Sequence, residues 1–327
     1  MIGDQLTAGR HGRVMIRRAR TRPFVGPRPG RLGRVAAQRV GLVLMLAAVP
    51  AAEGRAQCMG PRRTPPTRES LLVSTDRLSA RADDPDVTIL QVGESRREYD
   101  RGHIPGARFV DAGIFFAGES SGGGLAAYDV IADSLRALGL ADESRVVLYG
   151  SPLPVARGFL ALDVLGHGDR VAVLDGGLSA WRERGLPTTA REPSVESGDF
   201  AGRLEGWRIV SARWLRDAAE TSDIALVDAR SEGEFDDGHL SGARNLDWRL
   251  TLRGGVDADV AGDPRLRSVA ELRWLFRILG LGDADEIVFY SDDGSRAAYL
   301  YFVARYLGYE PRYLGDSRPD AQKERGS

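Results

Sequence analysis

Short apolar runs alternate with longer amphipathic segments through most of the chain, from about residue 70 to residue 317. The apolar runs have the length and composition of buried strands. The segments between them place apolar residues at helical spacing, and several end in glycine. This alternation predicts an α/β fold with small, mostly parallel sheets flanked by helices. We expect strands at 87–92, 145–149, 171–174, 224–229, 286–290 and 312–314, and helices at 75–82, 131–139, 211–219, 269–280 and 296–307.

The same pattern occurs twice. The segment Glu98–Arg108 reads EYDRGHIPGAR, and Glu234–Arg244 reads EFDDGHLSGAR, with seven of eleven positions identical. The strand-like runs Arg145–Tyr149 and Glu286–Tyr290 follow at corresponding places. An internal repeat of this length indicates two copies of one domain.

The repeat and the linker-like stretches predict the domain organisation. Polar, proline-containing stretches separate the apolar blocks, as expected of linkers. The predicted order is a basic head with a signal peptide (1–56), a linker (57–69), a first domain (70–187), a second linker (188–207), a second domain that contains a strand–loop–helix stretch of anion-binding type (208–317) and a tail (318–327).

The head is the part of the chain that predicts export. About ten apolar residues, 40–49, follow an arginine-rich flank and precede small residues. This is the order of a secretory signal peptide, with Gly54-Arg55-Ala56 before Gln57 as the expected cleavage site. The start codon is open between Met1 and Met15. We expect a secreted or periplasmic protein that meets the membrane only through this peptide.

Composition excludes several classes of function. Residues 1–63 carry 13 arginines against Asp4 and Glu53, so the remainder is acidic, because the whole chain has a net charge of −1. An acidic body is a poor nucleic-acid binder. The single cysteine, Cys58, and four scattered histidines argue against a disulfide and a metal site. We expect neither metal nor cofactor.

The motifs resemble the rhodanese family. The residues that carry the resemblance are Gly102–Ala107 (GHIPGA), Leu174–Trp181 (LDGGLSAW), Val227–Arg230 (VDAR) and Gly238–Ala243 (GHLSGA). The resemblance covers about residues 70–317, and the two-domain layout is similar to that of thiosulfate and 3-mercaptopyruvate sulfurtransferases. It implies that the second domain carries the nucleophile and that Gly150 stands at the nucleophile position of a first domain without chemistry.

The resemblance also implies the site. Ser291 takes the nucleophile position, the loop from Ser291 to Arg296 cradles the substrate anion, and Arg230 binds substrate. The expected substrate-binding residues are therefore Arg230, Asp292, Asp293, Gly294, Ser295 and Arg296. Each of these residues also has a structural alternative. Asp292 and Asp293 could cap the helix, Arg296 could brace the loop, and Arg230 could pair with Glu234. The histidines of the two Gly-His motifs are expected to hold their loops.

Serine changes the expected chemistry. Sulfur transfer needs a thiolate that forms a persulfide, and a serine hydroxyl forms neither. Asp292 and Asp293 add like charge where an anion would bind. We therefore expect an exported, catalytically degenerate protein that acts by binding a small sulfur-containing anion or a protein partner. The alternatives are an active thiosulfate or 3-mercaptopyruvate sulfurtransferase, and a phosphate-ester hydrolase.

Overall fold

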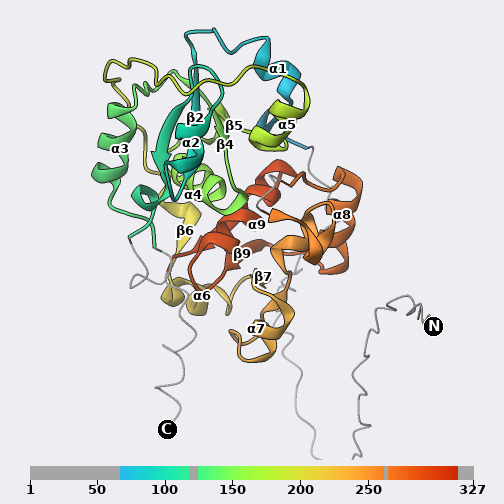
Figure 1. Cartoon of the computed structure of the whole chain (residues 1–327). Coiled ribbons are helices and arrows are strands. Elements are labelled where there is room, and N and C mark those ends of the chain that lie inside the picture. The colour runs from blue at the N-terminus through green and yellow to red at the C-terminus, as the bar shows by residue number, and fades with distance from the viewer. Residues whose placement is uncertain (1–66, 118–123, 261–263, 316–327) are drawn as a thin grey trace, which may run out of the picture. The chain divides into compact units, whose positions relative to one another are not determined.

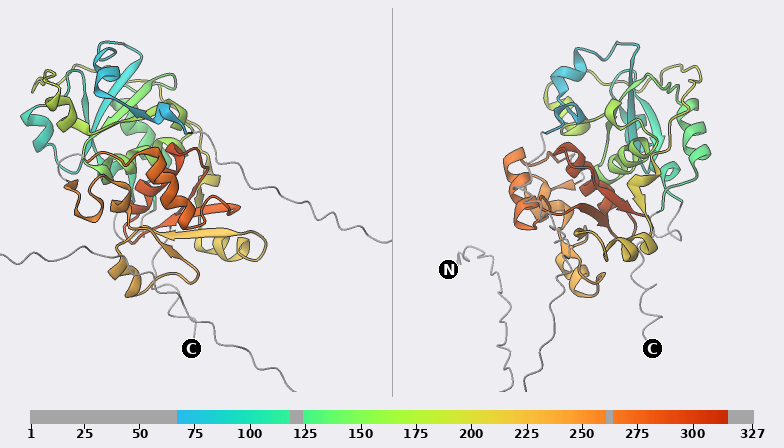
Figure 2. Two further views of the ribbon diagram at one scale, coloured as in Figure 1. Left: turned by 90° about the vertical axis from the view of Figure 1, so that its right-hand side faces the viewer. Right: turned by 180° about the vertical axis from the view of Figure 1, so that it is seen from behind.

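A computed structural model describes residues 67–117, 124–260 and 264–315, all within one unit that spans residues 58–327 (Figure 1). The predicted signal peptide with its predicted cleavage site, Cys58 and the tail lie outside the described residues. Each repeat forms a five-stranded, all-parallel sheet with helices on both faces, as Figure 2 shows from two further sides. The predicted α/β fold is therefore confirmed.

The first sheet has the strand order β1-β5-β4-β2-β3. Two helices pack against one face through Leu78 and Trp181, and two others pack against the opposite face through Leu135 and Phe159. The strands are β1 (Leu72–Val73), β2 (Val87–Gly93), β3 (Arg108–Asp111), β4 (Arg145–Tyr149) and β5 (Val171–Leu174). The helices are α1 (Thr75–Ser79), α2 (Arg97–Arg101), α3 (Tyr128–Ala137), α4 (Pro152–Val164) and α5 (Gly177–Glu183).

The second sheet repeats this order as β6-β10-β9-β7-β8. Its helices begin at residues that the sequence marks as caps: Ser231 and Ser268 each form a capping box with the glutamate three residues on. The strands are β6 (Ile209–Val210), β7 (Ile224–Asp228), β8 (Arg244–Asn245), β9 (Glu286–Tyr290) and β10 (Arg312–Leu314). The helices are α6 (Ala212–Ala218), α7 (Glu232–Asp236), α8 (Val269–Ile278) and α9 (Ser295–Tyr306).

Helices α4 and α9 join the two halves. The rings of Phe159 and Phe302 meet edge to face, with centroids 4.9 Å apart, inside one apolar core that contains residues of both halves. Asp163 on α4 is buried beside this contact and accepts a hydrogen bond from the Tyr301 hydroxyl at 2.7 Å. Its carboxylate also lies 2.9 Å from Nε of Arg305, a buried side chain of α9. A buried charge pair therefore links the two helices.

Among the described residues, no helix is long and apolar enough to span a bilayer. Nor do the described histidine and acidic side chains form a group of three or more that could hold a metal ion.

Candidate functional site

The two Gly-His loops are structural. His103 stacks on Tyr99 with ring centroids 3.6 Å apart, and its Nδ1 lies 2.9 Å from the Tyr99 carbonyl oxygen. In the second half His239 stacks on Phe235 in the same way, and its Nδ1 contacts the Phe235 carbonyl oxygen at 2.8 Å. Both rings hold the turn of their own loop, as the sequence indicated.

The loop Ser291–Gly294 joins strand β9 to helix α9. Strand β9 is apolar and buried, and Gly294 ends the loop with φ of 78°, a conformation that favours glycine. Ser291 follows the strand directly and is fully buried. Its Oγ accepts a hydrogen bond from the backbone N–H of Ala297 at 3.3 Å. The serine oxygen thus faces the first turn of α9.

Two carboxylates of the loop accept hydrogen bonds from backbone N–H groups at the start of α9, where an anion would otherwise bind. Asp293 Oδ1 accepts the N–H of Ser295 at 2.9 Å, and its Oδ2 accepts the Ser295 hydroxyl at 2.9 Å. Asp292 Oδ1 accepts the N–H of Asp293, also at 2.9 Å. A carboxylate at a helix N-terminus stabilises the helix by about 0.3–1 kcal/mol. Asp293 therefore acts on α9 as a capping residue, although Gly294 is the residue at the cap position itself.

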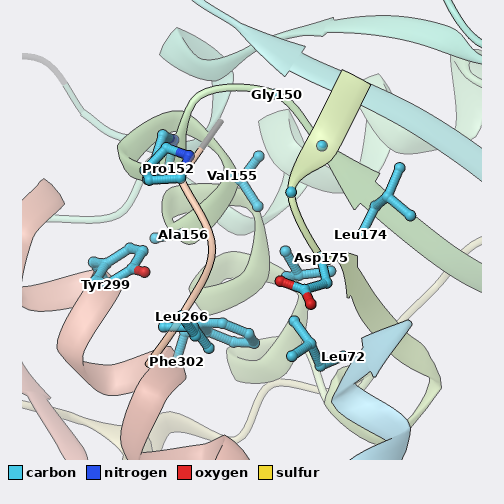
Figure 3. Close-up of a pocket in the computed structure, with 14 residues that line it drawn as sticks. Leu72, Gly150, Pro152, Val155, Ala156, Leu174, Asp175, Leu266, Tyr299 and Phe302 are labelled. Carbon is cyan, nitrogen blue, oxygen red and sulfur yellow. The ribbon is translucent and has the colours of Figure 1, made fainter. Parts of the chain in front are cut away.

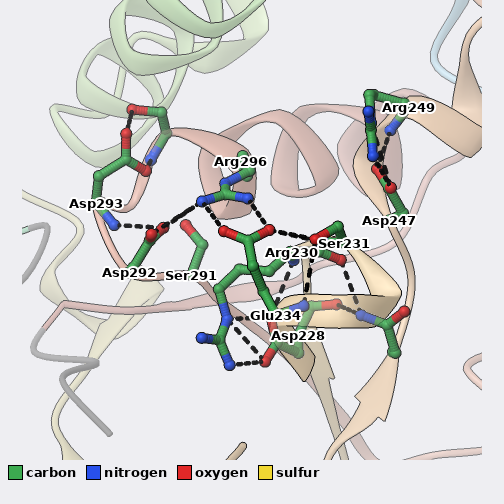
Figure 4. A network of polar contacts seen from close by, with 12 residues as sticks. Asp228, Arg230, Ser231, Glu234, Asp247, Arg249, Ser291, Asp292, Asp293 and Arg296 are labelled. Carbon is green, nitrogen blue, oxygen red and sulfur yellow. Dashed lines mark hydrogen bonds and ion pairs between the residues drawn. The ribbon is translucent and has the colours of Figure 1, made fainter. Parts of the chain in front are cut away.

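Arg296 braces the loop. Its guanidinium donates to both carboxylate oxygens of Glu234, at 2.6 and 2.9 Å, and to Asp292 at 2.9 Å (Figure 4). These hydrogen bonds from Arg296, with help from Ser231, lower the pKa of Glu234 to about 2. The guanidinium of Arg296 is thus already committed to two carboxylates of the chain.

Arg230 also has a partner, but not the one suggested by its spacing from Glu234. Its Nε and Nη2 donate to the buried carboxylate of Asp228 at 3.0 and 2.7 Å, and Nη2 also donates to the Gly238 carbonyl oxygen. The hydrogen bond to Asp228 raises the pKa of Arg230. The alternative that Arg230 pairs with Glu234 is wrong, because Arg230 pairs with Asp228 and Glu234 is bound by Arg296.

The first half contributes a residue that the sequence pattern did not single out. Arg157 of α4 donates from Nε to the Ser295 hydroxyl at 2.6 Å, and its Nη2 lies 3.4 Å from Asp293 Oδ2. It also stacks on Phe116. The only charged residues in α4 are Arg157 and Asp163, and both make contacts with the second half. A charge in an otherwise apolar helix was the signal that could have identified them.

The charges around the loop are predominantly negative. Two guanidinium groups, those of Arg157 and Arg296, meet four carboxylates: Glu94, Glu234, Asp292 and Asp293. Asp292 and Asp293 are about half exposed, so they face an approaching solute. The structure thus brings the predicted loop residues together and leaves an excess of negative charge at the mouth of the loop.

The corresponding loop of the first half has no room for a side chain. Gly150 has φ of 133°, and a Cβ atom there would lie 2.2 Å from the Val92 carbonyl oxygen. The loop borders a pocket of about 40 Å³, which has room for only a few waters. Figure 3 shows Asp175, Tyr299 and Phe302 around it. Burial raises the pKa of Asp175. With this backbone, a nucleophilic side chain does not fit at position 150.

Known proteins match both halves. The model of the family described as rhodanese-like domain matches residues 74–184 and 211–316. The chain is 32% identical over 265 residues to the sulfur carrier protein TtuD of Thermus thermophilus, covering 73% of this chain and 88% of that protein. It is 30% identical over 271 residues to a probable 3-mercaptopyruvate sulfurtransferase of Pseudomonas aeruginosa, covering 75% and 93%. The crystal structure of the Escherichia coli 3-mercaptopyruvate sulfotransferase SseA superposes with a TM-score of 0.63 at 22% identity, covering 76% of this chain and 99% of SseA.

Proposed function

The chain belongs to the rhodanese family as a tandem-domain member, and on this premise we propose that it is an exported scaffold that does not transfer sulfur and acts by binding. We assign the nucleophile position to Ser291, the residue directly after β9. The observation that carries the proposal is that this residue is a buried serine whose oxygen already accepts an N–H of α9. A hydroxyl cannot form the persulfide that sulfur transfer requires.

The loop's own contacts support the same conclusion. The carboxylate of Asp293 takes the Ser295 N–H, and Arg296 is held by Glu234 and Asp292. A divalent sulfur anion would have to displace these carboxylates and meet the remaining negative charge. Of the two ligands expected from the sequence, this charge disfavours the small sulfur-containing anion. We therefore propose a protein partner as the ligand of the second domain.

An active sulfurtransferase is the second candidate, because relatives about 30% identical carry sulfurtransferase names. The two proposals differ in one assay: cyanide-dependent thiocyanate formation from thiosulfate and from 3-mercaptopyruvate. The first proposal expects no turnover above that of Cys58→Ser, a variant without any thiol. Turnover by the unmutated chain well above this background would establish the second candidate and reject the first.

A further inference from the structure

The two sheets differ at the edge opposite the site loop. In the first half, a pocket of about 390 Å³ lies at the amino-terminal ends of β2, β4 and β5, beside α1. This volume is in the range of small-molecule sites. Its floor and walls are aliphatic and include Val73, Leu78, Val87, Val147 and Ala172.

The register of the repeats identifies the counterparts of this pocket in the second half. In the first sheet Leu72 pairs with Val173, and in the second sheet Ile209 pairs with Tyr313. Val173 and Tyr313 are therefore equivalent, and so are the residues directly before them, Ala172 and Arg312. In the next strands, Val87 pairs with Arg145 as Ile224 pairs with Glu286, so Arg145 corresponds to Glu286. Counterparts of both residues thus occupy the same edge of the second sheet.

The helix caps extend the correspondence. Ser74 caps α1 and accepts the N–H of Arg77, while Ser211 caps α6 and accepts the N–H of Trp214. Arg77 therefore corresponds to Trp214. By the same count, Ser70 in the 3-10 turn before β1 corresponds to Trp207 in the turn before β6.

In the second half these four counterparts form one cluster. Arg312 donates to both oxygens of Glu286, at 2.7 and 2.9 Å. Its guanidinium lies 4.8 Å from the ring centroid of Trp214 and 5.6 Å from that of Trp207. In the first half the corresponding residues are Ser70, Arg77, Ala172 and Arg145, and all four border the pocket. The pocket lies where the second half has the arginine and the two indole rings.

The charge at the pocket is positive. It is bordered by four arginines, of which Arg81 pairs with Asp84 and Arg170 pairs with Glu143. Asp169 also borders the pocket and is paired with Arg68. Within the described part of the chain, Arg77 and Arg145 form no ion pair within 4 Å, although the charge of Arg145 adds to the hydrogen bond from Arg81 in lowering the pKa of Asp84. Two cations thus border an aliphatic floor.

We propose that this pocket is a ligand site of the first domain for a small aliphatic carboxylate. The carboxylate of the ligand would bind Arg145, which stands at the position of Glu286, so the positive charge would come from this strand and the negative charge from the ligand. The hydrocarbon chain of the ligand would cover Val147 and Ala172. A charge-assisted hydrogen bond selects the anion, and the apolar floor selects the chain. The proposal stands apart from that for the Ser291 loop and does not depend on it.

Titration calorimetry of the full chain with octanoate tests the proposal. Octylammonium, which has the same hydrocarbon chain and the opposite charge, is the matched probe. We expect saturable one-to-one binding of octanoate, with octylammonium at least tenfold weaker. Arg145→Leu should weaken octanoate binding about tenfold or more, as expected for losing a charged hydrogen bond. Arg97→Glu, an exposed charge change on α2, should leave it unchanged.

A second variant closes the pocket. Ala172→Arg with Arg145→Glu copies the Arg312–Glu286 pair, so it should fold and abolish octanoate binding. Circular dichroism and the urea midpoint report folding, and Arg145→Leu gives an independent answer if the double variant is unstable. The proposal is overturned if octanoate does not bind, if octylammonium binds as tightly, or if the folded double variant binds unchanged.

Discussion

The carboxylate of Asp293 accepts the backbone N–H of Ser295 at 2.9 Å, so the chain itself occupies a donor at the start of helix α9. This N-terminus is the place where a strand–loop–helix unit presents N–H groups to an anion. Arg157 from the other half approaches the same carboxylate. The loop therefore satisfies hydrogen-bond donors of its own helix N-terminus with side chains of the chain itself.

Gly150 should tolerate no side chain. Gly150→Ala places Cβ 2.2 Å from the Val92 carbonyl oxygen and should destabilise the protein by more than about 2 kcal/mol. Gly106→Ala is the matched control, because Gly106 also has positive φ but a Cβ atom there would have no neighbouring atom within 4 Å. Its cost should be about 1 kcal/mol. Urea unfolding of both variants measures the difference, and equal costs would contradict the steric explanation.

The buried Asp163 should hold the two halves together. Asp163→Asn removes the buried carboxylate that faces Arg305 and Arg208. Arg305 is then left with Glu310 as its close partner, so the change should cost up to about 3–5 kcal/mol in the free energy of unfolding.

The matched control is Asp169→Asn, which removes an exposed carboxylate that pairs with Arg68 and lies 3.9 Å from Arg305. Because exposed ion pairs contribute little, its urea midpoint should stay close to that of the unmutated chain. The prediction fails if the two variants unfold at similar urea concentrations.

The Glu234–Arg296 contact should make the protein sensitive to acid. The folded pKa of Glu234, about 2, is below the ordinary value of 4.5, so the stabilisation is complete above pH 4.5 and is lost as the pH falls towards 2. The side chain is 40% exposed, which keeps the effect below about 1 kcal/mol.

The difference in urea midpoint between the unmutated chain and Glu234→Gln measures this effect. It should be largest at neutral pH and shrink between pH 4.5 and pH 3. A difference that stays constant over this range would show that the carboxylate charge contributes nothing.

Export is predicted by the head of the chain. Expression in a bacterial host should yield a mature protein that begins at Gln57, as determined by amino-terminal sequencing of the exported fraction. Replacing Leu44 and Leu46 with arginine interrupts the apolar run and should keep the protein in the cytoplasm. Retention of the unmutated chain at full length inside the cell would contradict the prediction.

Much of the fold could be predicted because most strands are apolar runs that alternate with helical patterns. The sequence did not predict β1, β6 and β8, since strands of two residues have no measurable period, nor β3, which has only two apolar residues between Arg108 and Asp111. The Gly-His motifs could be placed because their contacts are local: each histidine packs on an aromatic residue four positions earlier.

The partners within the site were harder to predict because they come from distant parts of the sequence. Asp293 meets Arg157, which lies 136 positions earlier, and Arg296 meets Glu234 across 62 positions. A spacing of four residues suggested Glu234 as an alternative partner of Arg230, whereas the fold gives each of them a different partner. Local periodicity contains no information on such contacts.

The thiocyanate assay on a graded set of loop variants decides whether the serine at position 291 prevents sulfur transfer. All variants carry Cys58→Ser, so that a thiol is present only where position 291 is cysteine. The form with Ser291 should show no turnover from thiosulfate or 3-mercaptopyruvate. Ser291→Cys should gain activity, and adding Asp292→Ala and Asp293→Ala should raise it at least tenfold by freeing the α9 N-terminus and lowering the thiol pKa. Turnover by the serine form, at a rate similar to that of the cysteine variants, would show that the second domain transfers sulfur without a thiol at position 291.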